Sequence, residues 1–397
     1  MPGFAEAPRP IDHSLHVDAQ MPVRPIETPI PSFGSGEIFS RQSDVPTGGN
    51  TREPFRLDLT GQPEVAERIA SLPTTTEQFA KLGLTPESAK EAREKQQLAG
   101  KVFLVIGTGP ESMGEAAAVE LAARGGYVIG VTRSESGAGF MTKANGIAED
   151  GYKRTSWISA DITKLHTGTK KMEDPDKGRI DDPQHVDNFL AGVINAGQIM
   201  RVSAEMTDIK DTPARLDGVI IACGTRKDMF MSMASDEDVK TVMEGNFHAP
   251  LRIIQAAYRS MRRPEQRQGI VGRVVALSSK AHEAAPSQGG YGPSKAALNN
   301  AVRSLIMEQQ RRSPDSKLTV NAVSPGLVAT GFVNDLTDEM RTAVLVDTDA
   351  DRELTAEEMG VLMAHMVTED LPAEINGMPN DILGRGEVVD FGHPKTA

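Results

Sequence analysis

The sequence has little cysteine, few aromatic residues and no long apolar run. Cys223 is the only cysteine among 397 residues, so no disulfide can form within the chain, and a reducing compartment suits it. No stretch reaches the roughly 18 apolar residues that would predict a membrane span. The N-terminus lacks a basic segment followed by an apolar one, which is the pattern of a secretory signal. We therefore expect a cytoplasmic protein with no membrane partner.

Positive charge is also in short supply. The chain has 43 Lys and Arg against 55 Asp and Glu, which gives a formal net charge of −12. A surface with this balance argues against nucleic acid as the main partner. Hydrophobic residues make up 39% of the sequence, which is compatible with a well-buried core and an ordinary globular protein.

The chain divides into three regions of different texture. Residues 1–55 contain repeated prolines and no sustained helical or strand period, which predicts an extended arm of the kind that is usually disordered. Within residues 56–99, proline followed by acid opens the segments at Pro63 and Pro86, which predicts two short helices. Residues 100–397 are expected to form the main domain.

A strand, a glycine-containing loop and a helix open this domain. Val102–Ile106 is a continuous apolar run, typical of a strand that is buried on both faces of a parallel sheet. The loop that follows could be a plain tight turn, but before a helix it also suits a dinucleotide, because glycines let the backbone approach a pyrophosphate. The candidate cofactor-binding residues of the loop are Gly107, Gly109, Ser112, Met113 and Gly114.

The second apolar run, Tyr127–Arg133, bears on the choice of cofactor. Its tip carries Thr132 and Arg133 where an NAD site would carry an acid for the ribose hydroxyls. A guanidinium suits a 2′-phosphate, so NADP(H) is the expected cofactor; the alternative is an arginine that merely faces solvent. A third run ends in Asp161 and Ile162, which are placed to approach the adenine. A polar, charged segment at 164–183 predicts an inserted surface loop.

Later apolar runs predict the rest of the sheet. The run Leu216–Gly224 ends in Cys223 and Gly224, which would pass beside the cofactor, although Cys223 also suits a small buried hydrophobe. Further strands are expected within Arg273–Ser279, Leu318–Phe332 and, at the edge, Ile382–Gly392. Regular alternation with helices predicts an α/β fold, a doubly wound, Rossmann-like parallel sheet with an N-terminal extension.

Two polar features interrupt this pattern. Asn246 lies in a helix expected from Asp236 to about Arg262, and a buried asparagine there commonly marks a kink or a bound water. Tyr291 and Lys295 are spaced i, i+4, which stacks the phenol and the ammonium on one helix face. A fixed positive charge lowers the pKa of a phenol, which predicts a proton donor for neutral pH. A hydroxyl at the preceding strand end, Ser279 or Ser278, would hold a substrate carbonyl.

Taken together, these motifs over residues 100 to about 392 resemble the classical short-chain dehydrogenase/reductase family. The resemblance implies that Tyr291 protonates the carbonyl oxygen, Lys295 lowers the tyrosine pKa and binds the nicotinamide ribose, and Ser279 positions the carbonyl. Asn246 would hold a water of the proton relay. It also implies that Pro325, Gly326 and Thr330 line the nicotinamide site, together with Val323.

The sequence departs from the family pattern at three places. The glycine loop is one residue longer and resembles that of ketoreductase domains in fungal-type fatty acid synthases. The usual Asn-Asn-Ala-Gly after the fourth strand is replaced by Ile221–Gly224. Ser279 matches the family by strand alignment, whereas Ser278 matches it by spacing to Tyr291.

Two classes of function follow from these features. The first is an enzyme that reduces a ketone with NADPH, most plausibly a 3-oxoacyl thioester or a related small molecule. The second is a binding or scaffold protein that keeps the fold and has little turnover. The complete Ser, Tyr, Lys and Asn set favours the enzyme. From the resemblance we also expect a lid over Phe332–Thr355 and a homo-oligomer, a dimer or a tetramer.

Overall fold

The computed structural model describes residues 53–133, 139–147, 154–167, 185–205, 207–208, 212, 214–227, 230–268, 271–283, 289–371, 379–383, 385, 387 and 389–391. Residues 1–52 of the predicted arm and residues 168–183 of the predicted surface loop lie outside this part of the chain.

A parallel sheet forms the centre of the main domain. In the described chain it has seven strands in the order β3-β2-β1-β4-β5-β6-β9, and each neighbouring pair is parallel. The order reverses between β1 and β4, so ligands are expected outside the carboxyl ends of these strands. The predicted doubly wound sheet is confirmed. Its strands are β1 (Val102–Ile106), β2 (Tyr127–Thr132), β3 (Thr155–Ser159), β4 (Gly218–Ile221), β5 (Arg273–Leu277), β6 (Thr319–Pro325) and β9 (Pro379–Ile382).

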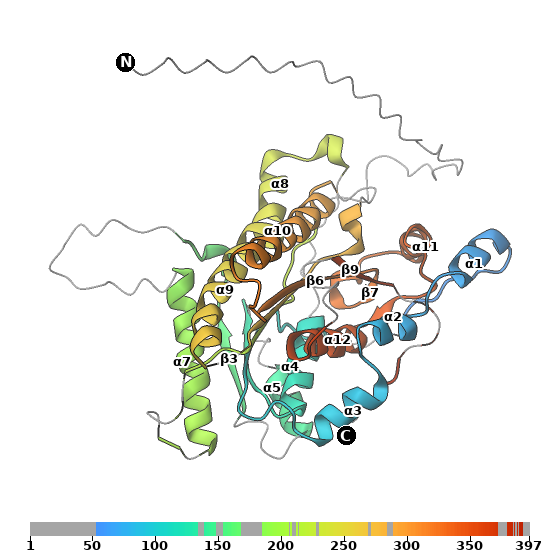
Figure 1. Ribbon diagram of the computed structural model, residues 1–397. Helices are drawn as coiled ribbons and strands as arrows, with labels where there is room; N and C mark the ends of the chain where they lie inside the picture. The colour runs from blue at the N-terminus through green and yellow to red at the C-terminus, as the bar shows by residue number, and fades with distance from the viewer. Residues whose placement is uncertain are drawn as a thin grey trace, which may run out of the picture. The chain divides into compact units, whose positions relative to one another are not determined.

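Helices cover both faces of the sheet (Figure 1). One face packs against α7 (Val186–Glu205), α9 (Ala249–Gln268) and α10 (Tyr291–Arg312), and the other against α4 (Met113–Ala123), α5 (Gly139–Ile147) and α12 (Ala356–Thr368).

The alternation of side chains in β1 explains why its sequence is apolar throughout. Phe103 and Val105 belong to one apolar cluster, while Leu104 and Ile106 belong to the cluster on the other face. Both faces of this strand are therefore buried. Among the described helices, none combines the length and the hydropathy needed to cross a bilayer.

Three short helices precede the sheet, one more than predicted. Helices α1 (Pro63–Ala70) and α3 (Pro86–Glu94) begin at the prolines that predicted them. Helix α2 (Thr75–Lys81) was missed, although its start has a recognisable signal. Thr74 and Glu77 form a capping box in which each side chain accepts a hydrogen bond from the other residue's backbone N–H.

The chain from β6 to α12 contains the predicted lid region. It comprises the short strands β7 (Val328–Ala329) and β8 (Leu354–Thr355), which pair in parallel, with helix α11 (Asp338–Asp347) between them. A 3₁₀ turn, Gly331–Val333, connects β7 to α11.

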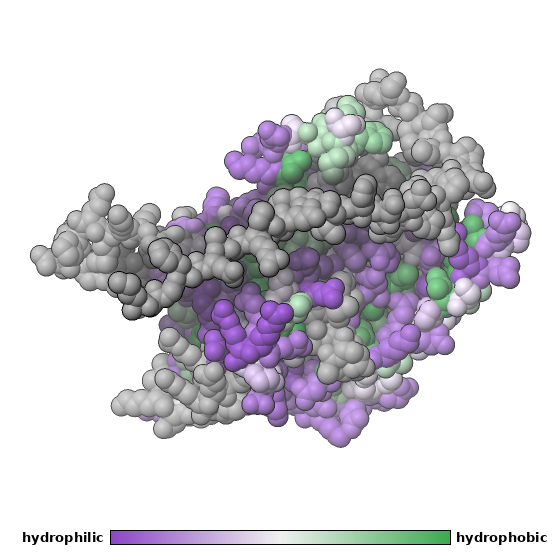
Figure 2. Space-filling model, turned by 45° about the horizontal axis from the view of Figure 1, so that its top comes forward, coloured by the Kyte–Doolittle hydropathy of each residue, from purple (hydrophilic) through white to green (hydrophobic). Residues whose placement is uncertain are grey.

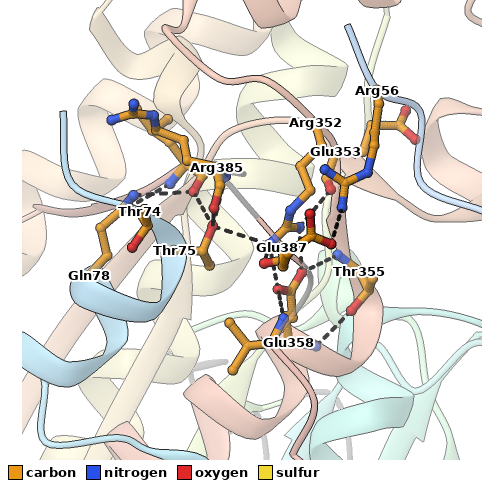
Figure 3. Close-up of polar contacts among 12 residues, drawn as sticks. Arg56, Thr74, Thr75, Gln78, Arg352, Glu353, Thr355, Glu358, Arg385 and Glu387 are labelled. Carbon is orange, nitrogen blue, oxygen red and sulfur yellow. Dashed lines mark hydrogen bonds and ion pairs between the residues drawn. The ribbon is translucent and has the colours of Figure 1, made fainter. Parts of the chain in front are cut away.

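Arg352 joins the extension, α12 and the C-terminal segment in one buried network (Figure 3). Its guanidinium, 0% exposed, makes two bonds to the Glu358 carboxylate, at 2.9 and 2.7 Å, and one to the Thr75 hydroxyl at 3.2 Å. It also donates to the Glu387 carbonyl at 2.9 Å. The extension is therefore packed into the same core region as the C-terminal residues.

The predicted edge strand at Ile382–Gly392 was placed wrongly. The edge strand is β9, which ends at Ile382, and the described residues between 383 and 391 contain no strand. Their backbone groups bond to side chains instead: Leu383 N–H donates to Gln78 Oε1 at 2.9 Å, and Val389 N–H donates to Glu358 Oε1 at 2.9 Å. These partners lie far away in the sequence, so a local pattern could not reveal them.

The Arg352–Glu358 pair gives a stability prediction. Replacement Arg352→Met leaves the Glu358 carboxylate buried without its two guanidinium donors, which should lower the free energy of unfolding by about 3 to 5 kcal/mol. Urea denaturation followed by circular dichroism measures this loss. The control is Arg56→Ala, which breaks an exposed ion pair with Glu387 and should cost at most about 1 kcal/mol. Equal losses in the two variants would contradict the assigned role of the buried pair.

Candidate active site

Tyr291 and Lys295 lie one turn apart at the start of α10, beyond the end of β5. The Lys295 side chain is almost fully buried, and its Nζ donates to the Leu277 carbonyl oxygen at 2.8 Å. The same Nζ lies 5.7 Å from the centre of the Tyr291 ring. The structure therefore brings the phenol and the ammonium together as the i, i+4 spacing predicts.

The Lys295 ammonium is strongly affected by its burial. Desolvation lowers its pKa to about 8, while a charge on Cys223 would raise it. An ammonium has three N–H donors, and within the described chain the Leu277 carbonyl is the one oxygen bonded to it. Two donors of a buried cation are thus left for hydroxyl groups of a ligand.

Asn246 connects the segment after β4 to the helix that carries Tyr291. It lies in a π-helical turn, Glu244–His248, between α8 (Asp236–Met243) and α9. The irregularity that the sequence predicts in this helix is this π-helical turn. Its Oδ1 accepts from Thr225 N–H at 2.7 Å, and its Nδ2 donates to the Thr225 carbonyl at 2.8 Å. Nδ2 also donates to Ser294 Oγ at 3.1 Å, and that hydroxyl donates to the Tyr291 carbonyl at 2.6 Å. Asn246 therefore ties the segment after β4 to the first turn of α10.

The two candidate serines differ in exposure. Ser278 is 2% exposed, its N–H donates to the Val323 carbonyl at 2.7 Å, and its Oγ lies 3.4 Å from the Lys295 carbonyl. Ser279 is half-buried, and its Oγ accepts from Ala281 N–H at 3.2 Å. The hydroxyl of Ser279 can therefore reach a ligand more readily than that of Ser278.

The glycines of the loop between β1 and α4 differ in the space available for a side chain. Gly107 has φ +97°, and a Cβ there would lie 2.8 Å from the Ala222 backbone; a Cβ at Gly114 would lie 2.4 Å from the Gly107 carbonyl oxygen. These two glycines are needed for packing against the segment after β4. A Cβ at Gly109 would meet nothing within 4 Å, so this position faces open space where a pyrophosphate could approach.

Ser112 ends the glycine loop at the start of α4. It is the N-cap of α4: its Oγ accepts from Glu115 N–H at 3.0 Å and donates to the Gly107 carbonyl at 2.9 Å. Met113 is the first residue of the helix and packs against the core. The longer loop therefore ends in an ordinary helix N-terminus, the feature that attracts a phosphate.

Arg133 and Cys223 each follow the carboxyl end of a strand, β2 and β4 respectively. Arg133 is exposed, just after Thr132 at the end of β2. Burial raises the pKa of the Cys223 thiol to about 11, against opposing effects of the Lys295 and Arg133 charges. The thiol is therefore a poor nucleophile, in agreement with a packing role.

The remaining predicted residues follow β3, β4 and β6. Asp161 caps a 3₁₀ turn that begins at Ile162, and its Oδ1 accepts from the Thr163 N–H and hydroxyl at 3.1 and 2.7 Å. A Cβ at Gly224 would lie 3.1 Å from Asn246 Oδ1 and 3.6 Å from Lys295 Nζ, which places Gly224 beside the predicted catalytic residues. The last three residues end or follow β6: Pro325, Gly326 and Thr330.

The sequence did not single out two residues that touch this site. The Phe332 ring lies 6.1 Å from the Tyr291 ring, and the Arg226 guanidinium stands 5.4 Å from the Phe332 centroid. Arg226 also pairs with Asp335. No local motif marks these contacts, because they join the segment after β4 to the lid region.

Apolar side chains are exposed soon after Arg226. Phe230, Met231 and Met233 are 44%, 61% and 77% exposed. Figure 2 shows an apolar patch at the top of the view, over the part of the chain that precedes α8. A surface of this kind suits an apolar ligand or partner.

These features fit a bound dinucleotide. Gly109 is open beside a helix N-terminus, and Lys295 presents donors of a buried cation at the same edge of the sheet. Because residue 224 is glycine, no side chain lies between Asn246 Oδ1 and Lys295 Nζ at this position.

The sequence is similar to known proteins over most of the main domain. Residues 184–377 match the family model described as enoyl-(acyl carrier protein) reductase. The chain is 25% identical over 272 residues to the 3-oxoacyl-acyl-carrier-protein reductase FabG of Haemophilus influenzae, covering 68% of this chain and 92% of that protein. FabG of Escherichia coli is also 25% identical over 272 residues, with 68% and 91% covered.

A solved structure supports the fold independently. The short-chain type dehydrogenase/reductase of Mycobacterium ulcerans superposes with a TM-score of 0.56 at 20% identity, covering 72% of this chain and 90% of that one. The family match, the curated relatives and the strand order all agree with the motifs around Tyr291 and Lys295. These agreements support the resemblance of the chain to the classical short-chain dehydrogenase/reductase family.

Proposed function

We propose that the protein reduces the ketone of a 3-oxoacyl thioester to a secondary alcohol with NADPH. The observation that carries the proposal is the buried Lys295 ammonium 5.7 Å from the Tyr291 ring, with Asn246 bonded to the same helix turn through Ser294. A phenol beside a fixed cation is a proton donor, and a scaffold has no need of one. The relatives named as 3-oxoacyl reductases support this substrate class.

In this proposal each residue has a separate task. The Tyr291 hydroxyl donates its proton to the ketone oxygen, and Lys295 stabilises the phenolate that remains. The Ser279 hydroxyl holds the ketone oxygen in place for that transfer. Asn246 keeps the first turn of α10 in position and holds a water that returns a proton toward Lys295. When bound, NADPH supplies the hydride.

The proposed cofactor preference rests on Arg133. Its guanidinium is exposed at the end of β2, where it can form charge-assisted bonds to a 2′-phosphate. Thr132, Asp161 and Ile162 would complete the adenosine side of the site. Pro325, Gly326 and Thr330 would line the nicotinamide side.

The proposal extends to the setting of the reaction. The exposed apolar side chains after Arg226 suit an acyl chain, and we place the reaction in fatty acid biosynthesis in the cytoplasm. The protein would act as a homo-oligomer, with residues 56–99 as a helical extension and residues 100–397 as the catalytic domain. The likeness of the glycine loop to fungal-type fatty acid synthases stays a prediction.

The proton donor is tested by Tyr291→Phe. Removing the hydroxyl should lower kcat by about 10² to 10⁴-fold with a 3-oxoacyl thioester or a model diketone, because general acid catalysis contributes this much. The dissociation constant for NADPH should change little. Loss of NADPH absorbance at 340 nm gives the rate, and fluorescence titration gives the binding. Tyr258→Phe, on α9, is the matched control; a Tyr291→Phe enzyme with wild-type kcat would refute the assignment.

The cofactor preference is tested by Arg133→Ala. The loss of charge-assisted bonds to the 2′-phosphate should weaken NADPH binding by about 10 to 100-fold, while NADH binding stays nearly unchanged. Fluorescence titration with both nucleotides measures the two effects. Arg311→Ala, at the far end of α10, controls for the loss of one surface charge. Equal weakening of NADPH and NADH would remove the phosphate role from Arg133.

A further inference from the structure

The lid region rests on a small apolar cluster that the N-terminal extension completes. Leu327, Val333, Leu345 and Ala350 are its buried members, and Phe55 and Leu57 pack against them from the extension. Few buried side chains provide limited free energy against the entropy of ordering a helix and a turn. Phe55 and Leu57 share this packing with Leu336, Val344 and Leu383, so removing either side chain should weaken a small cluster.

Residues 55–57, here called the strap, also bond to the lid region through the backbone. Leu57 N–H donates to the Asp351 carbonyl at 2.8 Å, and Glu353 N–H donates to the Phe55 carbonyl at 2.9 Å. Arg56 and Arg352 form the antiparallel bridge between these bonds. In Figure 3 Arg56 lies beside Arg352 and Glu353. The strap is thus joined by one antiparallel bridge to the segment that leads into β8.

One buried carboxylate continues this connection into the lid. Glu353 is 0% exposed; its Oε2 accepts from Phe55 N–H at 3.0 Å, and its Oε1 pairs with the Arg341 guanidinium. Arg341, itself buried on α11, donates to the carbonyls of Val333 and Leu336. The strap, Glu353 and Arg341 therefore fix both ends of the turn at 333–336.

That turn adjoins a side chain that lies against the proposed proton donor. Val333 directly follows Phe332, whose ring lies 6.1 Å from the Tyr291 ring, and Asp335 holds Arg226 over the same phenylalanine. A shift of this turn would therefore change the wall beside Tyr291. A series of contacts therefore connects the strap to the Tyr291 phenol, and no residue of the glycine loop takes part in it.

We propose that Glu353 and Arg341 are positioning residues for the substrate, and that the strap anchors them, so that the N-terminal extension is part of the substrate site. The inference rests on the proposed function, because it takes Tyr291 as the proton donor. It assigns to residues 55–57 a role in how the ketone is held and none in how the nucleotide is held.

The first test measures the lid region directly. Glu353→Gln removes the charge that Arg341 needs, and Phe55→Ala removes apolar packing while the ion pair stays intact. In both variants of the full chain, amide hydrogen exchange of residues 331–347 should become at least about tenfold faster, while that of β1 and β5 stays unchanged. Unchanged exchange in 331–347 in both variants would overturn the proposal.

The second test separates substrate from cofactor. In both variants KM for a 3-oxoacyl thioester should rise by about tenfold, while the dissociation constant for NADPH stays within about twofold of wild type. Faster exchange without a change in KM would also overturn the proposal, since the lid would then be loosened without consequence for the substrate.

The matched control is Lys90→Ala, on α3 of the same extension and outside the strap. Its side chain forms an exposed ion pair with Glu94, so exchange and KM should both stay as in wild type. A Lys90→Ala variant that behaves like Glu353→Gln would refute the specific role of the buried pair. Wild-type protein that oxidises no NADPH with any ketone would instead overturn the proposed function, and the exchange measurement would still decide whether the strap holds the turn.

Discussion

A buried ammonium is the constraint on which the site depends. The Lys295 ammonium is buried at the edge of the sheet and loses its hydrogen bonds to water. The bond to the Leu277 carbonyl at the end of β5 replaces one of them. The cost is reflected in the pKa, which burial lowers to about 8. The position of this cation is fixed by two of the most regular elements of the fold, β5 and α10. The i, i+4 spacing on α10 places the Tyr291 phenol beside it.

The nucleotide side of the site depends on a different constraint, which is close backbone contact. Gly107 and Gly114 leave no room for a Cβ because the loop is packed against Ala222 and against itself. Gly109 is open, and Ser112 caps the helix that follows. The extra residue in the loop is therefore accommodated without loss of the helix N-terminus. The sequence of this motif departs from the family pattern, yet the close-packed glycines, the open position and the helix N-terminus are all present.

The parts that sequence could predict are those with a local signal. The apolar run Val102–Ile106 predicts both ends of β1 correctly, because both faces of this strand are buried and all five of its residues are apolar. The pair Tyr291 and Lys295 followed from helical spacing. Helix α2 had a signal in the Thr74 capping box that was overlooked.

What sequence could not predict are contacts between distant segments. Phe332 reaches Tyr291 from the lid, and Thr75 meets Arg352 from 277 positions away. The C-terminal strand was misplaced for the same reason, since the apolar residues Val389 and Phe391 pack against the core without joining the sheet. An apolar sequence is expected of any buried segment, so the apolar residues here did not distinguish a strand from irregular chain.

The joining of these distant segments also bears on how the protein is made. Thr75 leaves the ribosome before its partners Arg352 and Arg385, which follow 277 and 310 residues later. At about 5 to 20 residues per second, the extension waits on the order of tens of seconds for the groups that bury it. During synthesis α1, α2 and α3 are therefore exposed to chaperones and proteases until the segments around Arg352 and Arg385 have emerged and cover them.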